Sequence, residues 1–184
     1  MSPHHDYTFA DYLLVERDSE IKHEFDAGEI LARPGGTTRH NALAVHVAAT
    51  LEQTRASGCI VFESSQRVRI IATGRATHPD LSMVCGPIEY DAEDDAHTTI
   101  TNPVLLIEVL SSTTETGDRG NKWMHYQRIP SLQEYVLVSQ EPRIEVFRRK
   151  PSGTWEYFEA SEGSVSLATG PTLDLSMLYA DLPV

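Results

Sequence analysis

The stretch NPVLLIEVLSSTTETGDRGNK, residues 102–122, contains the apolar run around which the fold is organised. Residues 104–110 are apolar except for one acid, Glu108. An apolar run bounded by Asn102-Pro103 and by a Ser/Thr-rich loop is typical of a strand that is buried on both faces. Burying an ionised carboxylate there costs on the order of several kcal/mol unless a cation pairs with it. Glu108 therefore predicts a cationic partner, and the next lysine along the chain is Lys122.

The rest of the chain alternates between helix-like and strand-like segments. Helical spacing or capping residues mark residues 7–17, 37–57, 119–129 and 173–182. Strand-like runs occupy residues 59–63, 66–71, 78–85, 103–110, 154–160 and 164–169, with hairpins predicted at 22–34 and 134–149. Helices among mostly sequential strands predict an α+β or α/β fold, with a mixed β-sheet flanked by helices. Because no internal repeat or low-complexity linker interrupts the pattern, we expect a single domain over residues 1–184.

Composition restricts the classes of function. A chain of 184 residues buries a core without staples, and its net charge of −12 argues against a sequence-blind, high-affinity nucleic-acid binder. An enzyme that meets phosphates only locally, through a metal ion, remains compatible with this charge. No apolar run approaches the ~18 residues of a membrane span, and the N-terminal residues lack the pattern of a secretory signal.

The cysteines and the charged stretches carry three further expectations. Cys59 and Cys85 lie far apart, so they are interpreted as buried thiols rather than a disulfide or zinc site, which favours a reducing cytoplasm. The acidic run of residues 88–96 predicts a solvated loop, with a calcium site as the lesser alternative. Arg67 and Arg69 alternate with apolar residues, as on an edge strand, or flank a nucleic-acid groove.

Two acids and a lysine form the candidate catalytic group. Asp80 opens the apolar strand after Pro79, and Glu108 lies in the second apolar strand. If these strands pair, the carboxylates approach one another, and a divalent cation relieves their repulsion; oxygen ligands favour Mg²⁺ or Mn²⁺. Lys122, in the helix downstream, would orient or deprotonate a water and shield phosphate charge. The alternative is that Glu108 is simply paired with a buried cation and that Asp80 has no catalytic role.

Two more side chains are candidates for substrate binding. His40, near the start of the long helix, would contact a phosphate or help the site, and a cap or core role explains it equally well. Tyr126 lies one helical turn after Lys122 on the same face, where it would touch substrate or pack beside Trp123. Both alternatives stay open for each residue.

Four segments together resemble a known family. They are HEFDAGEI (23–30), RHNALAVHVAATL (39–51), HPDLSMVCGP (78–87) and PVLLIEVLSSTTETGDRGNKWMHYQRIPSLQEYVLV (103–138). Over nearly the whole chain they are similar to the Uma (Uma two) family of putative restriction endonucleases, within the PD-(D/E)xK nuclease superfamily. The resemblance implies a restriction-endonuclease-like fold, hydrolysis of DNA phosphodiester bonds with Mg²⁺ or Mn²⁺, and a homodimer.

The resemblance also assigns residues. It implies that Asp80 and Glu108 bind the metal ion, that Lys122 is the catalytic lysine and that Glu24 is a further acid. The superfamily pattern places the lysine two residues after the glutamate, where this chain has Leu110. Lys122 matches a lysine that has moved to the following helix. Two other functions stay open: a catalytically degenerate nuclease fold acting as a regulatory or assembly module, and a phosphohydrolase of small substrates.

Overall fold

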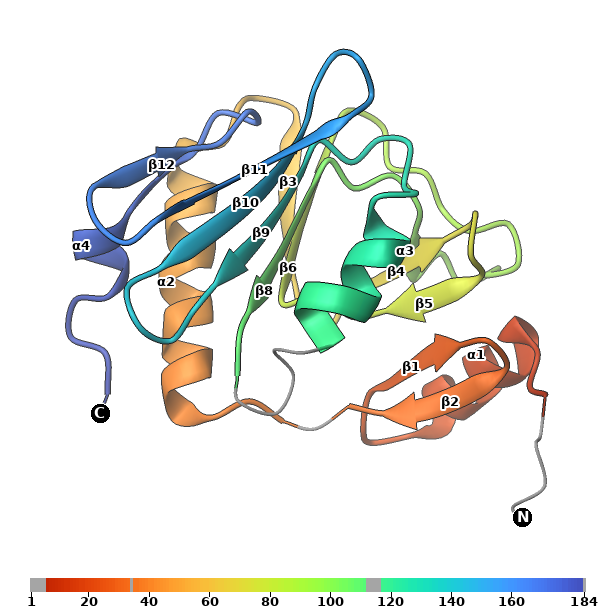
Figure 1. Cartoon of the computed structure of the whole chain (residues 1–184). Coiled ribbons are helices and arrows are strands. Elements are labelled where there is room, and N and C mark those ends of the chain that lie inside the picture. Colours follow the sequence, from red (N-terminus) through yellow and green to blue (C-terminus); the bar gives the residue numbers. More distant parts are fainter. Residues whose placement is uncertain (1–5, 34, 112–116, 184) are drawn as a thin grey trace.

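The computed structural model describes residues 6–33, 35–111 and 117–183, and it contains two mixed sheets with helices against them (Figure 1). The helices are α1 (Phe9–Asp18), α2 (Thr38–Thr54), the π-helix η1 (Gly117–Lys122), α3 (Trp123–Tyr126) and α4 (Leu175–Leu178). The predicted mixed α+β architecture is therefore confirmed, although the strands form three sheets rather than one.

The larger sheet has six strands and contains both site strands. Its order is β11 (Trp155–Ala160), β10 (Ile144–Arg149), β9 (Glu134–Val138), β8 (Leu105–Val109), β6 (Leu81–Cys85) and β3 (Cys59–Glu63). Strands β8 and β9 are parallel, and the other neighbours are antiparallel. A parallel pair of strands needs a crossover connection, and the crossover between β8 and β9 contains η1 and α3.

The smaller sheet has five strands, and a third sheet has two. The order of the five-stranded sheet is β2 (Glu29–Ala32), β1 (His23–Asp26), β5 (Arg75–Thr77), β4 (Arg67–Ile70) and β7 (Thr99–Ile100). The last sheet pairs β12 (Ser164–Ser166) with β13 (Thr172–Asp174). The short strands β5, β7 and β13 were not predicted, and β13 replaces the first part of a C-terminal helix that was predicted over residues 173–182.

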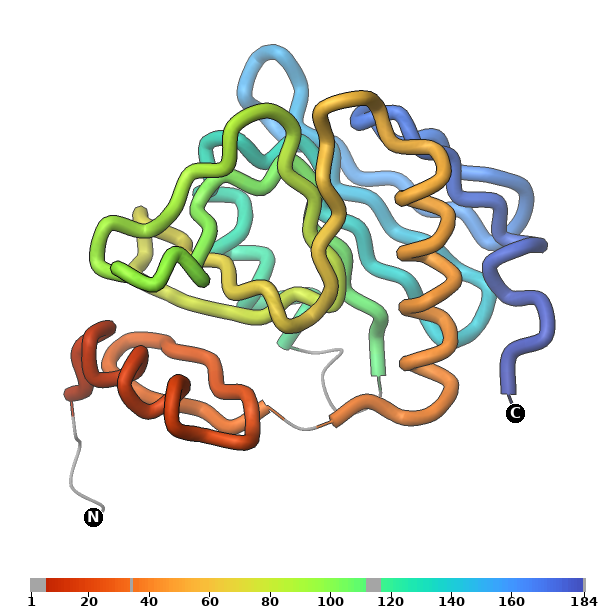
Figure 2. Tube along the Cα trace, turned by 180° about the vertical axis from the view of Figure 1, so that it is seen from behind, coloured from red at the N-terminus to blue at the C-terminus, as the bar shows by residue number. Residues whose placement is uncertain are grey.

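Strand β8 separates two apolar clusters, as its buried run requires. Leu105, Ile107 and Val109 pack with α2 on one face, and Figure 2 shows that helix running along the sheet. Leu106 and Leu110 pack on the other face, with residues of α3 and β4. Because strand side chains alternate, Glu108 belongs to this second face, toward the helix that carries Lys122.

The N-terminal segment forms its own small cluster beside the smaller sheet. Phe9, Tyr12 and Phe25 pack together with Ala76 of β5, and β1 pairs with β5 at the single register position Phe25–Ala76. In both views α1, β1 and β2 lie together at one end of the molecule (Figures 1 and 2). The predicted hairpin with its turn at residues 27–28 is confirmed, and its two strands bring the chain back toward the start of α2.

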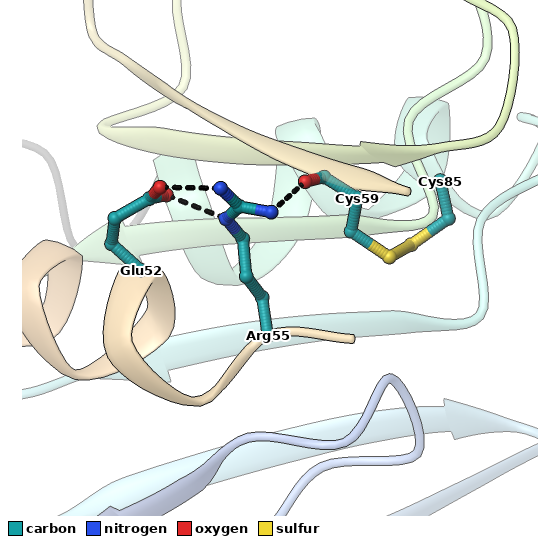
Figure 3. The surroundings of a disulfide bond; sticks show 4 residues. All are labelled: Glu52, Arg55, Cys59 and Cys85. Atoms are coloured by element: carbon teal, nitrogen blue, oxygen red, sulfur yellow. Dashed lines mark hydrogen bonds and ion pairs between the residues drawn. A yellow bond between two sulfur atoms is a disulfide. The ribbon is translucent and has the colours of Figure 1, made fainter. Parts of the chain in front are cut away.

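Cys59 and Cys85 form a disulfide, so the prediction of two separate buried thiols is wrong (Figure 3). The two residues are register partners on the antiparallel strands β3 and β6, with Cα atoms 4.0 Å apart. Their separation of 26 residues hid a cross-strand pairing that only the sheet brings about. Beside them, Arg55 joins Glu52 of α2 to the Cys59 carbonyl. Because both cysteines are in the disulfide, they no longer favour a reducing cytoplasm, and cytoplasmic location stays a prediction.

The acidic run of residues 88–96 is not simply a solvated loop, because two of its acids are buried. Asp94 accepts hydrogen bonds from Thr98 and Thr99, and Arg67 lies 3.8 Å from it. Arg69 pairs with Asp91 at 3.8 Å and lies over the ring of Phe9. Strand β4 is also internal to its sheet, so the edge-strand interpretation of these arginines is wrong.

Among the described residues, no helix combines the length and the apolar character that crossing a membrane requires.

Candidate functional site

Asp80 and Glu108 meet at the ends of two paired strands. Strands β6 and β8 are antiparallel, with Leu81 opposite Ile107. Asp80 precedes Leu81 and Glu108 follows Ile107, so the next register step places the two acids opposite each other. The Val109 amide donates to Asp80 Oδ2 at 2.7 Å, which ties the Asp80 carboxylate to the end of β8. The sequence alone did not establish whether these two strands pair, and in the structure β6 and β8 are neighbours in one sheet.

The Arg33 guanidinium and the His40 imidazole both contact the Asp80 carboxylate. Arg33 donates to its Oδ1 at 2.7 Å, and His40 Nε2 lies 3.1 Å from its Oδ2. Burial alone would raise the pKa of Asp80, but His40, Arg33 and the Val109 amide together lower it below its usual value. The same contact with Asp80 raises the pKa of His40. His40 thus contributes to the site by fixing Asp80, while Thr37 provides the helix cap.

Glu108 is almost completely buried, with 1% of its surface exposed. Lys122 Nζ and the Tyr126 hydroxyl both donate to its Oε1 at 2.9 Å. Burial raises the pKa of Glu108 to about 7; Lys122 opposes this rise, and the nearby Asp80 and Asp118 add to it. The second oxygen, Oε2, faces the Arg33 guanidinium at 3.7 Å. Glu108 therefore lies in a cluster whose negative charge is only partly compensated.

Lys122 reaches the carboxylates from the last residue of η1. Its Nζ lies 2.9 Å from Glu108 Oε1, 2.9 Å from Asp118 Oδ1 and 3.7 Å from Glu24 Oε1. Although burial works against its charge, Glu108, Glu24 and Asp118 raise the pKa of Lys122 above its usual value. The side chain of Asp118 is buried and pairs with Lys122 one turn later. The lysine therefore remains a cation fixed among three acids.

Glu24 joins the site from strand β1. Its Oε2 accepts from Arg75 at 2.9 Å and its Oε1 from Thr77 at 2.8 Å. Burial would raise the pKa of Glu24, but Lys122 and Arg75 lower it to about 2. Glu24 is thus an ionised acid at the rear of the cluster, where it helps to hold Lys122.

A cavity of about 330 Å³ opens onto the carboxylates. It is lined by Ile21, Lys22, Arg33, Gly35, Gly36, His40, Asn41, Ser64, Asp80, Glu108, Ser111, Asp118 and Lys122. His40 lines it, as a substrate-binding role would need. Tyr126 is 0% exposed, packs edge-on against Tyr135, and is not among the described residues that line the cavity. Residues 112–116 of the predicted Ser/Thr loop lie outside the described residues.

The sequence reasoning missed two contributors. Arg33, which follows β2, contacts both carboxylates, and no local pattern announced it. Asp118 could have been found, because acids and lysines four residues apart on a helix are neighbours. Arg33 lies 47 residues from Asp80, so only the return of the hairpin to the sheet reveals that contact.

The donor set is compatible with a hard divalent cation. Asp80 Oδ1 and Glu108 Oε2 both face one guanidinium, so a positive charge is already favoured between them. Within the described part of the chain, no group of three His, Cys, Asp or Glu side chains is placed to hold a metal ion alone. Two carboxylates completed by water and substrate oxygens suit Mg²⁺, which retains several waters in its protein sites.

Comparisons with known proteins agree with the resemblance in the sequence. Residues 9–181 match the family described as "Putative restriction endonuclease", Uma2. Two uncharacterized proteins of Synechocystis sp. are similar: slr1290 is 32% identical, covering 94% of this chain and 90% of that protein, and sll1609 is 30% identical, covering 80% and 84%. The crystal structure of a putative nuclease of DUF820 from Anabaena variabilis superposes with a TM-score of 0.73 at 19% identity, covering 95% of this chain and 98% of that one. The chain therefore belongs to the Uma2 family of putative restriction endonucleases.

Proposed function

We propose that this chain is a metal-dependent endonuclease that hydrolyses the phosphodiester bonds of DNA. The observation that carries the proposal is the meeting of Asp80 and Glu108 beside a cavity, with Lys122 fixed 2.9 Å from Glu108. Membership of the family supports nuclease activity. The requirement for a metal ion and the choice of DNA as substrate are parts of the proposal.

Asp80 and Glu108 would hold Mg²⁺ or Mn²⁺ beside the cavity. When bound, the ion would supply Lewis-acid polarisation of the phosphate and would lower the pKa of a water molecule. Asp80 is suited to this role because His40 and the Val109 amide fix its orientation and favour its ionised form. Residues that orient metal ligands in this way commonly change metal affinity or activity when they are replaced.

Lys122 is better suited to stabilising charge than to taking a proton. Three acids raise its pKa, so the ammonium group keeps its proton at neutral pH. A general base accepts a proton, so it must be deprotonated at the working pH, which requires a pKa near that pH. We therefore assign Lys122 to orienting the attacking water and to stabilising the negative charge that develops on the phosphate. Of the two roles considered for this lysine, the pKa direction supports the electrostatic one.

The test is a cleavage assay with the full chain. Duplex DNA, RNA and nucleotide substrates are incubated with Mg²⁺, Mn²⁺ or EDTA, and products are resolved by electrophoresis or chromatography. We expect DNA to be cut with either metal ion and not with EDTA. Asp80→Asn, Glu108→Gln and Lys122→Met should each reduce the rate by about 100-fold or more, because each removes a metal ligand or a transition-state cation.

Glu52→Gln is the matched control, since it changes an acid of α2 that pairs with Arg55 outside the cavity. Circular dichroism and thermal unfolding establish that each variant is folded. Wild-type rates in folded Asp80→Asn or Lys122→Met would contradict the assignment. Cleavage of nucleotides but not of DNA would instead indicate a phosphohydrolase of small substrates.

One observation favours a second candidate, a nuclease fold without catalysis that acts as a regulatory or assembly module. The Arg33 guanidinium lies between the two carboxylates, as expected of a site that has replaced its metal ion with a side chain. The net charge of −12 is also a handicap for binding DNA. Absence of both Mn²⁺ binding and cleavage would support this candidate. Homodimerisation and a cytoplasmic location stay predictions, and sedimentation of the full chain tests the first.

A further inference from the structure

We propose that Arg33 is an exchangeable counter-cation: it neutralises Asp80 and Glu108 when no metal ion is bound, and it turns to a substrate phosphate when a metal ion takes its place. The inference rests on the proposed function and assigns a residue that neither the sequence pattern nor the family description singles out. In this arrangement, metal binding and phosphate binding both depend on the Arg33 side chain.

The position of the guanidinium is the first argument. Nη2 donates to Asp80 Oδ1 at 2.7 Å and lies 3.7 Å from Glu108 Oε2. These are the oxygens left over by the other partners, because His40 and Val109 take Asp80 Oδ2, while Lys122 takes Glu108 Oε1. A divalent cation bound between the two acids on this side would occupy the place of the guanidinium. Arg33 and the metal ion would therefore compete for one position.

The incomplete bonding of Arg33 is the second argument. Its Nη1 is buried and has no hydrogen-bond partner among the described residues. A buried donor without a partner is unfavourable, so the arrangement on the carboxylates does not satisfy the whole guanidinium group. A phosphate offers several acceptor oxygens, which match the fork of a guanidinium. Release from the carboxylates onto a phosphate would satisfy both Nη groups.

The attachment of Arg33 is the third argument. Its backbone amide donates to the Lys22 carbonyl at 2.8 Å, so the backbone of the residue is held at the end of the hairpin and the exchange requires rotation of the side chain alone. The side chain is 18% exposed and lines the cavity. Lys122 differs, because it lies within 4 Å of three acids. Lys22 lines the cavity too, but its Nζ donates to Ser64.

Exchange of Arg33 has a thermodynamic consequence. Because the metal ion displaces the guanidinium from the acids, metal binding should increase the affinity for phosphate, and phosphate should increase the affinity for metal by the same factor. Removing Arg33 should uncouple the two. Free metal would bind more tightly, since it no longer competes with a side chain, whereas DNA would lose a contact.

The first experiment measures Mn²⁺ affinity by calorimetry for the wild type, Arg33→Gln and Lys22→Gln. Both variants lose one positive charge from the cavity wall, but only Arg33 touches the carboxylates. We expect Arg33→Gln to bind Mn²⁺ about tenfold more tightly than the wild type, within the usual range of coupling between sites. Lys22→Gln should change it by less than about threefold, because only screened, longer-range charge is lost.

The second experiment measures binding of a short fluorescent DNA duplex with Ca²⁺, with electrophoresis to check that the duplex remains intact. Arg33→Gln should bind it about tenfold more weakly than the wild type. Arg33→Lys keeps the charge but loses the fork, so it should retain near wild-type Mn²⁺ affinity and still bind DNA more weakly. It also serves as the second variant if Arg33→Gln does not fold.

The outcomes separate this inference from the proposed function. If the wild type cuts DNA but Arg33→Gln binds Mn²⁺ no more tightly than the wild type, the exchange is wrong and the nuclease assignment stands. If the wild type binds no Mn²⁺ and cuts nothing while Arg33→Gln binds it, Arg33 is confirmed as the occupant and the nuclease assignment fails. If neither protein binds Mn²⁺, both are wrong.

Discussion

Glu108 shows how a buried acid is accommodated at the scale of single residues. Its Oε1 accepts two hydrogen bonds from the helical segment after β8, while its Oε2 faces Arg33. Satisfying one oxygen fully and leaving the other toward the cavity keeps the carboxylate available for a ligand. The cost of burial appears in its pKa, which burial raises to about 7. A cation at Oε2 would recover part of that cost.

Gly36 controls the position of His40, and therefore of Asp80. A Cβ atom at Gly36 would overlap the His40 ring and come within 2.7 Å of Asn41 Oδ1. We predict that Gly36→Ala displaces His40 from Asp80 and lowers Mn²⁺ affinity and cleavage by about tenfold or more, as for other residues that orient metal ligands. Gly35→Ala is the control, because nothing lies within 4 Å of its Cβ. Equal Mn²⁺ affinities for the two variants would refute this role.

At the scale of elements, the site depends on one strand pair and one crossover. Strand β8 carries Glu108 and pairs with β6, which follows Asp80. The crossover to β9 passes through η1 and α3, which return Lys122 and Tyr126 to the Glu108 face. A lysine two residues after the glutamate would lie on this same strand face. Lys122 lies on the crossover instead, so its side chain approaches Glu108 from the helical layer.

The disulfide secures the opposite end of β6. Cys85 ends β6 and is bonded to Cys59 of β3, an edge strand of the six-stranded sheet. For a sequence separation of 26, chain-entropy arguments give about 3.5 kcal/mol of stabilisation. We predict that a reducing agent lowers the free energy of unfolding by about this amount in a urea titration. Mn²⁺ affinity should not change, because Asp80 lies at the other end of the strand.

A Cys59→Ala/Cys85→Ala double variant is the control for that measurement. Its stability should not respond to the reducing agent, and it should match the reduced wild type. A wild type whose unfolding midpoint is the same with and without reductant would show that the disulfide does not stabilise the fold.

At the scale of the whole molecule, the cavity is built from segments with separate apolar cores. Asp80, Glu108 and Lys122 belong to the six-stranded sheet and its crossover, whereas Glu24 and Arg33 belong to the N-terminal hairpin. The hairpin packs through its own cluster around Phe25. Ion pairs therefore connect the two parts: Glu24 with Lys122, and Arg33 with both acids. This arrangement makes the site sensitive to whatever loosens the hairpin.

Acid should weaken that connection through Glu24. Its pKa is about 2 in the folded protein and about 4.5 when unperturbed, so the folded state favours the ionised form. A lowered carboxylate pKa contributes stability above the unfolded value, and this contribution is lost as the pH falls from about 4.5 toward 2. We predict that the difference in unfolding free energy between the wild type and Glu24→Gln narrows by about 3 kcal/mol across that window.

Urea titrations at a series of pH values measure this difference. Glu20→Gln is the control, because it removes an acid that is exposed before β1 and lies outside the ion pairs of Glu24 with Lys122 and Arg75. A constant difference for Glu24→Gln would show that its ion pairs do not contribute to the acid dependence.

The sequence by itself predicted most of the local elements and identified Asp80 and Glu108 as candidate site residues. Helix α2 with its Thr37 cap, the hairpin at residues 23–32 and the buried strand around Glu108 follow from spacing, turn residues and apolar runs, which are local signals. The odd acid in β8 identified Glu108 as a residue that needs a partner. Lys122 was a candidate because it is the next lysine after Glu108 and lies in the following helix, and the family resemblance added its match to the catalytic lysine.

Only the tertiary structure decided which distant groups meet. The Cys59–Cys85 bond, the burial of acids beside the β4 arginines, and the contact of Arg33 with both carboxylates all join residues separated by many positions. Such contacts depend on strand order and register, and local pattern does not encode either. Electrostatics follows the same rule: the charge of each buried group depends on neighbours that folding brings within a few ångströms. The local sequence therefore specifies the helices and strands, and the order and register of the strands in the sheets bring the residues of the candidate site together.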